Sequence, residues 1–152
     1  MKDLRLSMNF QPKKITHDQI ADVIVEKFKD NDEITCYVGS NAATPTASLE
    51  ALTAVLKSRQ PRLPFIRMVH LLLQGPVPYV EKGLQDRVMA YSTFSGGEVR
   101  QAANEGRAYY LPCTLANLAS LIGKGRTFEP DVVFLKISQN EITGEYSLGL
   151  TV

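Results

Sequence analysis

Largely apolar segments of strand length recur along this chain, and they alternate with segments whose apolar residues follow helical spacing. The strand-like segments are residues 34–38, 65–73, 88–94 and 132–137. Several of them are apolar at consecutive positions, so both of their faces must be covered by other parts of the protein. Strands that alternate with helices are typical of a parallel sheet, because each helix returns the chain to the start of the next strand. We therefore predict an α/β fold: an open, largely parallel sheet with helices on both faces.

Two of the predicted helices begin at recognisable capping residues. Thr16 and Gln19 form a capping box before a helix that runs to Phe28. Thr44 followed by Pro45 predicts a capping threonine and a first-turn proline for the next helix. The apolar stripe of that second helix consists of Leu49, Leu52 and Leu56.

Glycines and a threonine mark two further helices. Gly96 and Gly97 are expected to open a short helix, and Gly106 is expected to close it. Thr114 predicts the cap of another helix, which Gly123 should end.

The bulk composition is that of one ordinary domain. The formal charge of the 152 residues is only +1, which argues against nucleic acid or an anionic membrane as the main partner. Residues 1–10 contain no signal-peptide core and no apolar run reaches the length of a membrane span, so we expect a cytoplasmic protein. Cys36 and Cys113 are far apart in apolar surroundings, and we expect buried free thiols and no metal site.

Three glycine-containing junctions follow predicted strands, and they are the best candidates for a ligand site. They are residues 39–45 (GSNAATP), 74–79 (QGPVPY) and 94–97 (FSGG). Open α/β sheets bind ligands at the carboxyl ends of their parallel strands. Glycine lets a ligand approach the backbone, and a helix that starts there offers free N–H groups. Each junction alone resembles an ordinary turn, but their joint occurrence predicts one ligand-binding edge.

The final segment, residues 146–152 (YSLGLTV), has the pattern of an apolar strand. A complete domain seldom ends on such a strand, because an uncovered strand offers open hydrogen-bonding edges. We therefore expect residues 1–152 to form an amino-terminal domain that is truncated at its carboxyl-terminal end. Apolar surface meant for the missing part should cause self-association.

Familiar catalytic signatures are missing from the sequence. The GSN at residues 39–41 lacks the second glycine of a nucleophile elbow, and there is no phosphate-binding loop or dinucleotide motif. We interpret His17 as a solvated surface residue and His70 as a hydrogen-bonded core residue. The sequence therefore predicts no catalytic residue and no metal ligand in this chain.

Polar residues surround Gly106 at the end of a predicted helix, and they allow two interpretations. In the structural one, Gly106 is a left-handed helix cap and Arg107 pairs with a nearby carboxylate. In the functional one, Asn104 or Arg107 lies at a pocket rim, where an arginine can bind a carboxylate with two hydrogen bonds.

In these segments the sequence resembles the acetyl-CoA hydrolase/transferase family, which includes 4-hydroxybutyrate, acetate and succinate CoA-transferases. The segments that carry the resemblance are GSNAATPTASLEAL, HLLLQGPVPY, FSGGEVRQAANEGRAYYLP and PDVVFLKISQNEITGEYSLGLTV. They occur in the family's order and cover nearly the whole chain from Gly39 onward. Tyr109 and Tyr110 replace a more usual aspartate–tyrosine pair, and residues 139–142 lack the usual prolines and histidine. These departures concern the preferred acyl group.

The resemblance implies the transfer of coenzyme A between small carboxylic acids, with acyl-CoA as substrate and no permanently bound cofactor. In the family, a glutamate of the second half attacks the thioester and forms a glutamyl-CoA intermediate, while the first half supplies pocket wall. Neither Glu98 nor Glu105 is expected to replace that glutamate, so the chain alone should be inactive. The implied partners are a missing carboxyl-terminal half or partner subunit and further copies in a homo-oligomer. The positions carried over as substrate-binding are Gly39, Ser40, Asn41, Gly75, Pro76, Phe94, Ser95, Gly96 and Asn104.

Two other functions stay open at this level. One is a stand-alone or regulatory module that binds CoA or carboxylates without catalysis. The other is a small α/β enzyme such as a sugar-phosphate isomerase, with His70 or an aspartate as base, although the missing phosphate motif weighs against it.

Overall fold

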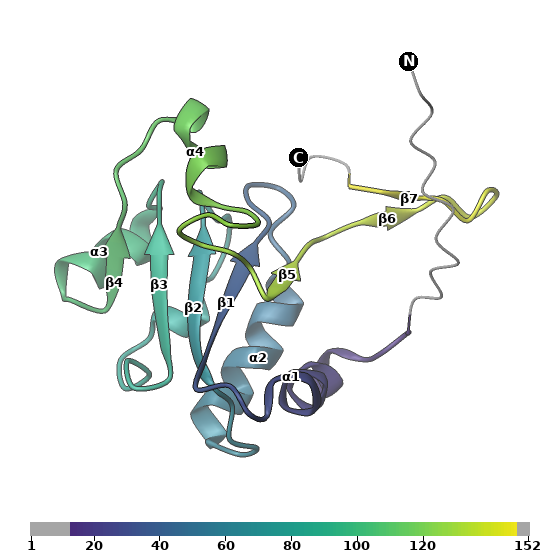
Figure 1. The fold of residues 1–152 in the computed structure, drawn as a ribbon, viewed down its shortest axis with the longest axis horizontal. Helices are drawn as coiled ribbons and strands as arrows, with labels where there is room; N and C mark the ends of the chain where they lie inside the picture. Colours follow the sequence, from purple (N-terminus) through teal and green to yellow (C-terminus); the bar gives the residue numbers. More distant parts are fainter. Residues whose placement is uncertain (1–12, 149–152) are drawn as a thin grey trace.

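A five-stranded parallel sheet forms the centre of the protein, as the computed structural model of residues 13–148 shows (Figure 1). The order of its strands is β4-β3-β2-β1-β5. The strands are β1 (Glu33–Val38), β2 (Phe65–His70), β3 (Val88–Ser92), β4 (Ala108–Tyr110) and β5 (Val132–Phe134). The helices are α1 (Ile20–Phe28), α2 (Thr46–Ser58), α3 (Gly97–Asn104) and α4 (Leu115–Leu121), with short 3-10 turns η1 (His17–Gln19) and η2 (Pro78–Val80). The predicted α/β fold with a parallel sheet is confirmed.

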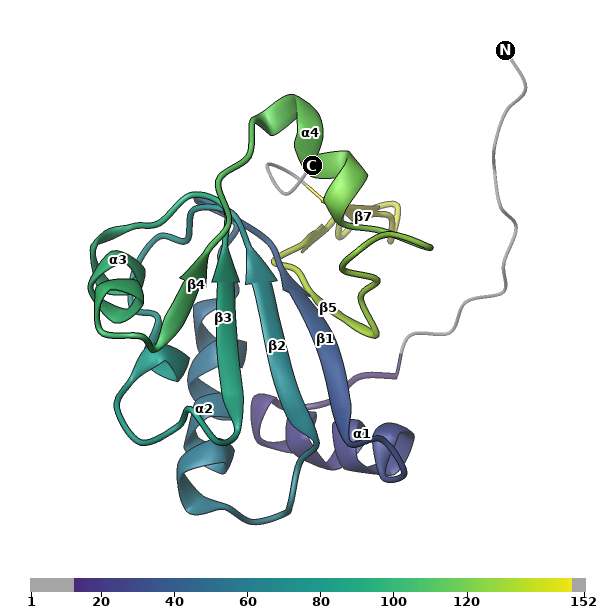
Figure 2. The ribbon, with the colours of Figure 1, turned by 60° about the vertical axis from the view of Figure 1, so that its left-hand side comes forward.

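One face of the sheet is covered by α1 and α2 (Figures 1 and 2). Crossovers between parallel strands are right-handed, so the connections from β1 to β4 lie on the same face. Helix α2 buries its predicted apolar stripe there, and the core side chains Leu49, Leu52 and Leu56 are almost completely inaccessible to solvent. Ile66 and Met68 of β2 belong to the same core.

The opposite face is covered by the segment that connects β4 with β5. This connection runs in the reverse direction across the sheet, and the right-handed rule therefore places it on the second face. Tyr91 packs there against Tyr109, with ring centroids 5.1 Å apart, and against Phe128 at 5.4 Å. Helix α4 buries none of its residues, whereas Phe128 of the same connection is buried.

Most predicted helix ends are found where the sequence placed them. Gln19 Oε1 accepts a hydrogen bond from the Thr16 N–H at 3.0 Å, and Thr114 Oγ1 accepts one from Asn117 N–H at 3.3 Å. Gly96 is the N-cap of α3, and Gly106 follows this helix with a left-handed φ of 74°. These predictions are confirmed.

The predicted capping role of Thr44 is wrong. Helix α2 begins at Thr46, its N-cap is Pro45, and no side chain caps it. The Thr44 hydroxyl instead donates to the Asn41 carbonyl at 2.6 Å and accepts from the Gln74 N–H at 3.1 Å. The hydroxyl is therefore used to tie two loops together and is not available to the helix.

Three strands are shorter than predicted, because β-pairing stops where the chain bends into the connecting loops. Strand β2 ends at His70, β3 at Ser92 and β5 at Phe134. The last predicted strand is found only as β7 (Tyr146–Ser147), which pairs antiparallel with β6 (Ser138–Gln139). Residues 149–152 lie outside the described residues.

Both cysteines are free thiols. Cys36 is buried in the sheet, and burial raises the pKa of its thiol to about 12. Cys113 is only partly buried, which differs from the expectation of two buried thiols. Among residues 13–148, no group of three His, Cys, Asp or Glu side chains could hold a metal ion, and no helix has the length and apolarity to cross a membrane.

Candidate functional site

The three glycine-containing junctions lie side by side at the carboxyl ends of β1, β2 and β3 (Figure 2). The Gln74 N–H donates to Thr44 Oγ1 at 3.1 Å, which joins the second junction to the first. The Thr93 N–H, just before the third junction, donates to the carbonyl of His70 at the end of β2 at 3.1 Å. All three junctions therefore lie along one edge of the sheet.

In the first junction, the predicted residues divide between structural contacts and an exposed tip. Gly39 is buried, and its N–H donates to the Phe134 carbonyl at 2.8 Å. Ser40 Oγ accepts from the Leu71 N–H at 3.3 Å, while Asn41 is exposed with a left-handed φ of 54°. Asn41 is thus the one of these three predicted residues whose side chain is exposed.

In the second junction, Gly75 and Pro76 are exposed. Gly75 has a φ of 86°, a conformation that favours glycine. Pro76 faces a groove of about 280 Å³ that it shares with Glu98 and Arg107, away from the third junction. Glu98 Oε2 accepts from the Val77 N–H at 2.7 Å, so this carboxylate holds the junction in place.

Replacing Glu98 by alanine is expected to lower the free energy of unfolding by about 1.5–3 kcal/mol, because it removes a hydrogen bond to a charged group. Chemical denaturation measures this change. Glu98→Gln keeps an acceptor oxygen and should recover part of the loss. A free energy of unfolding of Glu98→Ala equal to that of the unmodified chain would contradict this structural role of Glu98.

The third junction borders a cavity of about 560 Å³. Four of the predicted residues come together in it: Phe94, Ser95, Gly96 and Asn104. The complete lining consists of these four with Leu72, Arg100, Ala103 and Tyr110. The predicted residues of the first two junctions do not line this cavity but lie along the same edge of the sheet.

The cavity has a polar side and an apolar side. Arg100 and Asn104 are on α3, whose first N–H groups also point toward this edge. Arg100 Nη2 donates to the Ser95 carbonyl at 3.3 Å, and the buried Ser95 Oγ has no hydrogen-bond partner within residues 13–148. Phe94 and Tyr110, both large and partly exposed, form the apolar side. Such a cavity suits a short molecule with an anionic or carbonyl group at one end and an aliphatic part at the other.

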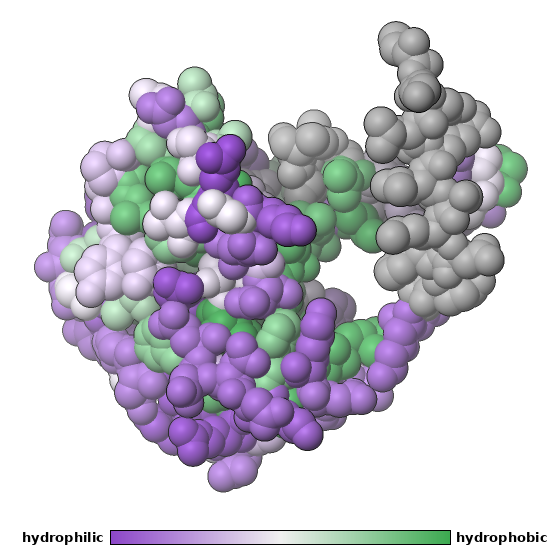
Figure 3. Space-filling view, in the orientation of Figure 1, coloured by the Kyte–Doolittle hydropathy of each residue, from purple (hydrophilic) through white to green (hydrophobic). Residues whose placement is uncertain are grey.

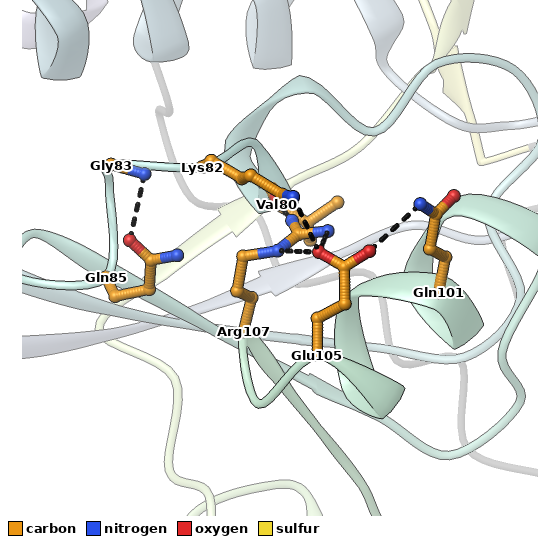
Figure 4. Close-up of polar contacts among 7 residues, drawn as sticks. All are labelled: Val80, Lys82, Gly83, Gln85, Gln101, Glu105 and Arg107. Atoms are coloured by element: carbon orange, nitrogen blue, oxygen red, sulfur yellow. Dashed lines mark hydrogen bonds and ion pairs between the residues drawn. The ribbon is translucent and has the colours of Figure 1, made fainter.

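Glu105 and Arg107 form a structural ion pair at the end of α3 (Figure 4). Glu105 Oε2 lies 3.0 Å from Arg107 Nη2 and 3.3 Å from Lys82 Nζ. A hydrogen bond from Gln101, together with Arg107 and Lys82, lowers the pKa of Glu105 to about 2. Arg107 also donates to the Val80 carbonyl, so its guanidinium contacts both a carboxylate and a backbone carbonyl of this chain. The structural interpretation of Arg107 is therefore correct.

His70 is a core residue, as predicted. Its side chain is completely buried, and Nδ1 lies 2.6 Å from the Leu71 carbonyl oxygen. A carbonyl oxygen can only accept, so Nδ1 carries the proton. Burial lowers the pKa of His70 to about 4, and the ring meets Tyr79 edge-on at 6.1 Å. The imidazole is neutral at pH 7 and does not line the cavity beside the third junction.

Sequence reasoning missed four cavity residues, namely Leu72, Arg100, Ala103 and Tyr110. One signal could have found Arg100, since it follows Gly96 by one helical turn and must lie on the same side of α3. No comparable signal exists for Leu72, which reaches the cavity from the loop after β2.

Comparison with known proteins supports the resemblance seen in the sequence. No protein-family model matches the chain. The 4-hydroxybutyrate coenzyme A transferase of Clostridium kluyveri is 31% identical over 86 residues, which cover 57% of this chain and 20% of that protein. The succinyl-CoA:acetate/propanoyl-CoA:succinate CoA transferase of Fasciola hepatica is 27% identical over 121 residues, covering 80% of this chain and 24% of that protein. The matched region thus spans less than a quarter of each relative. With two CoA transferases as homologues of modest identity, the resemblance of this chain to CoA transferases is confirmed.

Proposed function

We propose that this chain is the amino-terminal portion of a CoA-transferase that moves coenzyme A between small carboxylic acids. One observation carries the proposal: three glycine-containing junctions share one edge of a parallel sheet beside an amphipathic cavity, in a homologue of two CoA transferases. In this proposal the chain supplies the wall of the substrate pocket. We also keep the expectation of a cytoplasmic protein.

The catalytic carboxylate is proposed to come from polypeptide beyond this chain. Transfer through a glutamyl-CoA intermediate needs a carboxylate that is free to attack the thioester carbonyl. Glu98 holds the Val77 N–H, and Glu105 is held by Arg107 and Lys82. Both carboxylates therefore have structural roles at the candidate site. The relatives extend well beyond the matched region, which leaves room for a second half.

The cavity suggests how this wall could hold a substrate. Arg100 and the start of α3 would attract the negative charge of a carboxylate or of the oxyanion that forms during transfer. Phe94 and Tyr110 would contact the aliphatic part of the acid or of the acyl group. We propose short acids of the kinds that the relatives' names give, such as 4-hydroxybutyrate, succinate, acetate or propanoate. Water as the acceptor would turn the same site into a hydrolase.

The isolated chain is expected to show no exchange of coenzyme A between acetyl-CoA and 4-hydroxybutyrate. A chimera in which this chain replaces the matched segment of the Clostridium kluyveri relative should show this exchange. Chromatographic separation of the acyl-CoA products measures the exchange in both samples. Turnover by the isolated chain that is lost on Glu98→Gln would contradict the proposal that the catalytic carboxylate lies outside this chain.

A second candidate is a module that binds CoA or carboxylates without catalysis. It is favoured by one observation, namely that the described lining of the cavity contains no Asp or Glu side chain that could act as a nucleophile. Calorimetry with coenzyme A and with acetate separates the two: saturable binding together with an inactive chimera supports the module.

A further inference from the structure

The last residues of β2 and β3, His70 and Ser92, stand opposite each other in the sheet and carry polar side chains into the core. They are register partners, so their side chains lie on the same face of the sheet. Both residues are completely buried. Burying an imidazole or a hydroxyl without a hydrogen bond costs free energy. The hydrogen-bond partners of the two side chains therefore indicate what the pair does.

Each of the two side chains holds a carbonyl of the loop that follows its own strand. His70 Nδ1 donates to the Leu71 carbonyl at 2.6 Å. Ser92 Oγ lies 3.0 Å from the Phe94 carbonyl oxygen and 3.4 Å from that of Leu71. A hydroxyl has one proton to donate, and the shorter distance makes Phe94 its main acceptor. The Ser92 hydroxyl thus contacts both the loop after β2 and the loop after β3.

These two loops supply much of the cavity beside the third junction. Leu72 follows the Leu71 carbonyl directly, while Phe94 and Gly96 belong to the other loop, and all three of these lining residues face the cavity. A Cβ added at Gly96 would lie 3.6 Å from Leu72 Cδ1, so the two loops are in near contact where they line the cavity. A small displacement of either loop therefore changes the shape of the cavity.

The end of the sheet that carries these loops is also less hydrophilic than the opposite end. In the view of Figure 3, hydrophilic side chains cover most of the surface near the amino ends of the strands. Apolar and near-neutral side chains, drawn in green and pale colours, are frequent toward the carboxyl ends of β3 and β4 and on α4. Apolar contacts with a ligand weaken over short distances, so the positions of the loops at this end decide its affinity.

We propose that Ser92 is a positioning residue, whose hydroxyl fixes the loop after β3 against the loop after β2 and so sets the separation of Leu72 and Phe94 in the cavity. The inference rests on the proposed function, because it takes this cavity as the site of the acid or acyl group. Ser92 does not line the cavity, so it acts through the two loops and not on the substrate. Without the hydroxyl, the Phe94 carbonyl loses this hydrogen bond, whereas the Leu71 carbonyl keeps the one from His70.

Ser92→Ala in the chimera with the Clostridium kluyveri relative is expected to raise the KM for 4-hydroxybutyrate at least about fivefold and to change kcat less than about twofold. A wall that makes no bond to the reacting atoms holds the ground state and the transition state alike, so its displacement appears in KM. A purely structural role would lower the amount of folded enzyme, which lowers the apparent kcat and leaves KM unchanged. Ser92→Cys keeps a weaker donor and should have an intermediate KM.

Thr53→Val is the matched control for the loss of a buried hydroxyl. Thr53 is also buried, and its hydroxyl donates to the Leu49 carbonyl at 2.7 Å within α2, outside the cavity lining. This variant should keep the KM of the unmodified chimera. A Ser92→Ala chimera that also keeps this KM, or that loses kcat alone, overturns the proposal.

Amide hydrogen exchange on the isolated chain tests the same role without a substrate. In Ser92→Ala, peptides with residues 71–74 and 93–97 should exchange faster by a factor at least about threefold larger than peptides of α2, which report on global unfolding. Faster exchange in these loops, beside an inactive unmodified chimera, contradicts the proposed function but supports the positioning role of Ser92. Unchanged exchange in both loops contradicts that role whatever the activity of the chimera.

Discussion

Replacing Gly96 by valine is expected to reduce the affinity for a short carboxylic acid or its CoA thioester at least about tenfold, equivalent to about 1.4 kcal/mol. A Cβ at this position would lie 3.6 Å from Leu72 Cδ1 and 3.7 Å from the Leu73 carbonyl oxygen. A methyl group is therefore tolerated, but the two additional methyl groups of valine would take up space in the cavity. The φ of Gly96 is −69°, so a side chain causes no backbone strain here. Calorimetry on the chain, or kcat/KM in the chimera, measures the effect.

The neighbouring glycine provides the matched control for this experiment. A Cβ at Gly97 meets no atom within 4 Å, so Gly97→Val adds the same side chain in open space. Ligand binding should therefore survive Gly97→Val. Gly96 is the N-cap of α3 and Gly97 its first helical residue, so circular dichroism on both variants is needed to separate a cost to the helix from a loss of binding. Equal losses in both variants would show that the cavity beside Phe94 and Ser95 is not the binding site.

Stability is expected to fall by about 3 kcal/mol between pH 7 and pH 4 because of His70. Its pKa is about 4 in the folded protein, where burial disfavours the charged imidazolium, against an ordinary value of 6.5. The unfolded chain therefore binds more protons than the folded one between these two values, and acid favours unfolding. The stabilisation is complete above pH 6.5 and is lost as the pH falls toward 4. Urea denaturation at several pH values measures the slope.

His70→Leu should flatten this pH dependence, because it removes the titrating group and keeps an apolar side chain in the core. It also removes the shorter of the two hydrogen bonds to the Leu71 carbonyl, which keeps only the one from Ser92 Oγ, so the variant should be less stable at pH 7. The slope between pH 4 and pH 6.5, and not the absolute stability, is the decisive quantity. His17→Leu, the same substitution on an exposed side chain, is the matched control. An unchanged slope in His70→Leu would refute the assignment.

Local patterns in the sequence were sufficient to predict most of the helices and strands of this fold. Apolar runs indicated strands β1, β2, β3 and β5, and Gly96, Gly106 and Thr114 marked helix ends correctly. Such signals are local, since a capping residue or a strand needs only its sequence neighbours. Thr44 was misassigned because its hydroxyl bonds to Gln74, a residue of another loop. A contact across 30 positions leaves no trace in a local pattern.

The sequence by itself determined that the glycine-containing junctions meet at one edge, because parallel strands must place their carboxyl ends together. Only the tertiary structure decided which residues share the cavity, joining Leu72 and Tyr110 to Phe94, Ser95 and Gly96. The physical reason is that a cavity depends on the paths of separate loops and on the directions of their side chains. The role of Glu98 was also decided by the tertiary structure. A glutamate can be a nucleophile by residue type, but in this fold the Glu98 carboxylate accepts a hydrogen bond from the Val77 N–H.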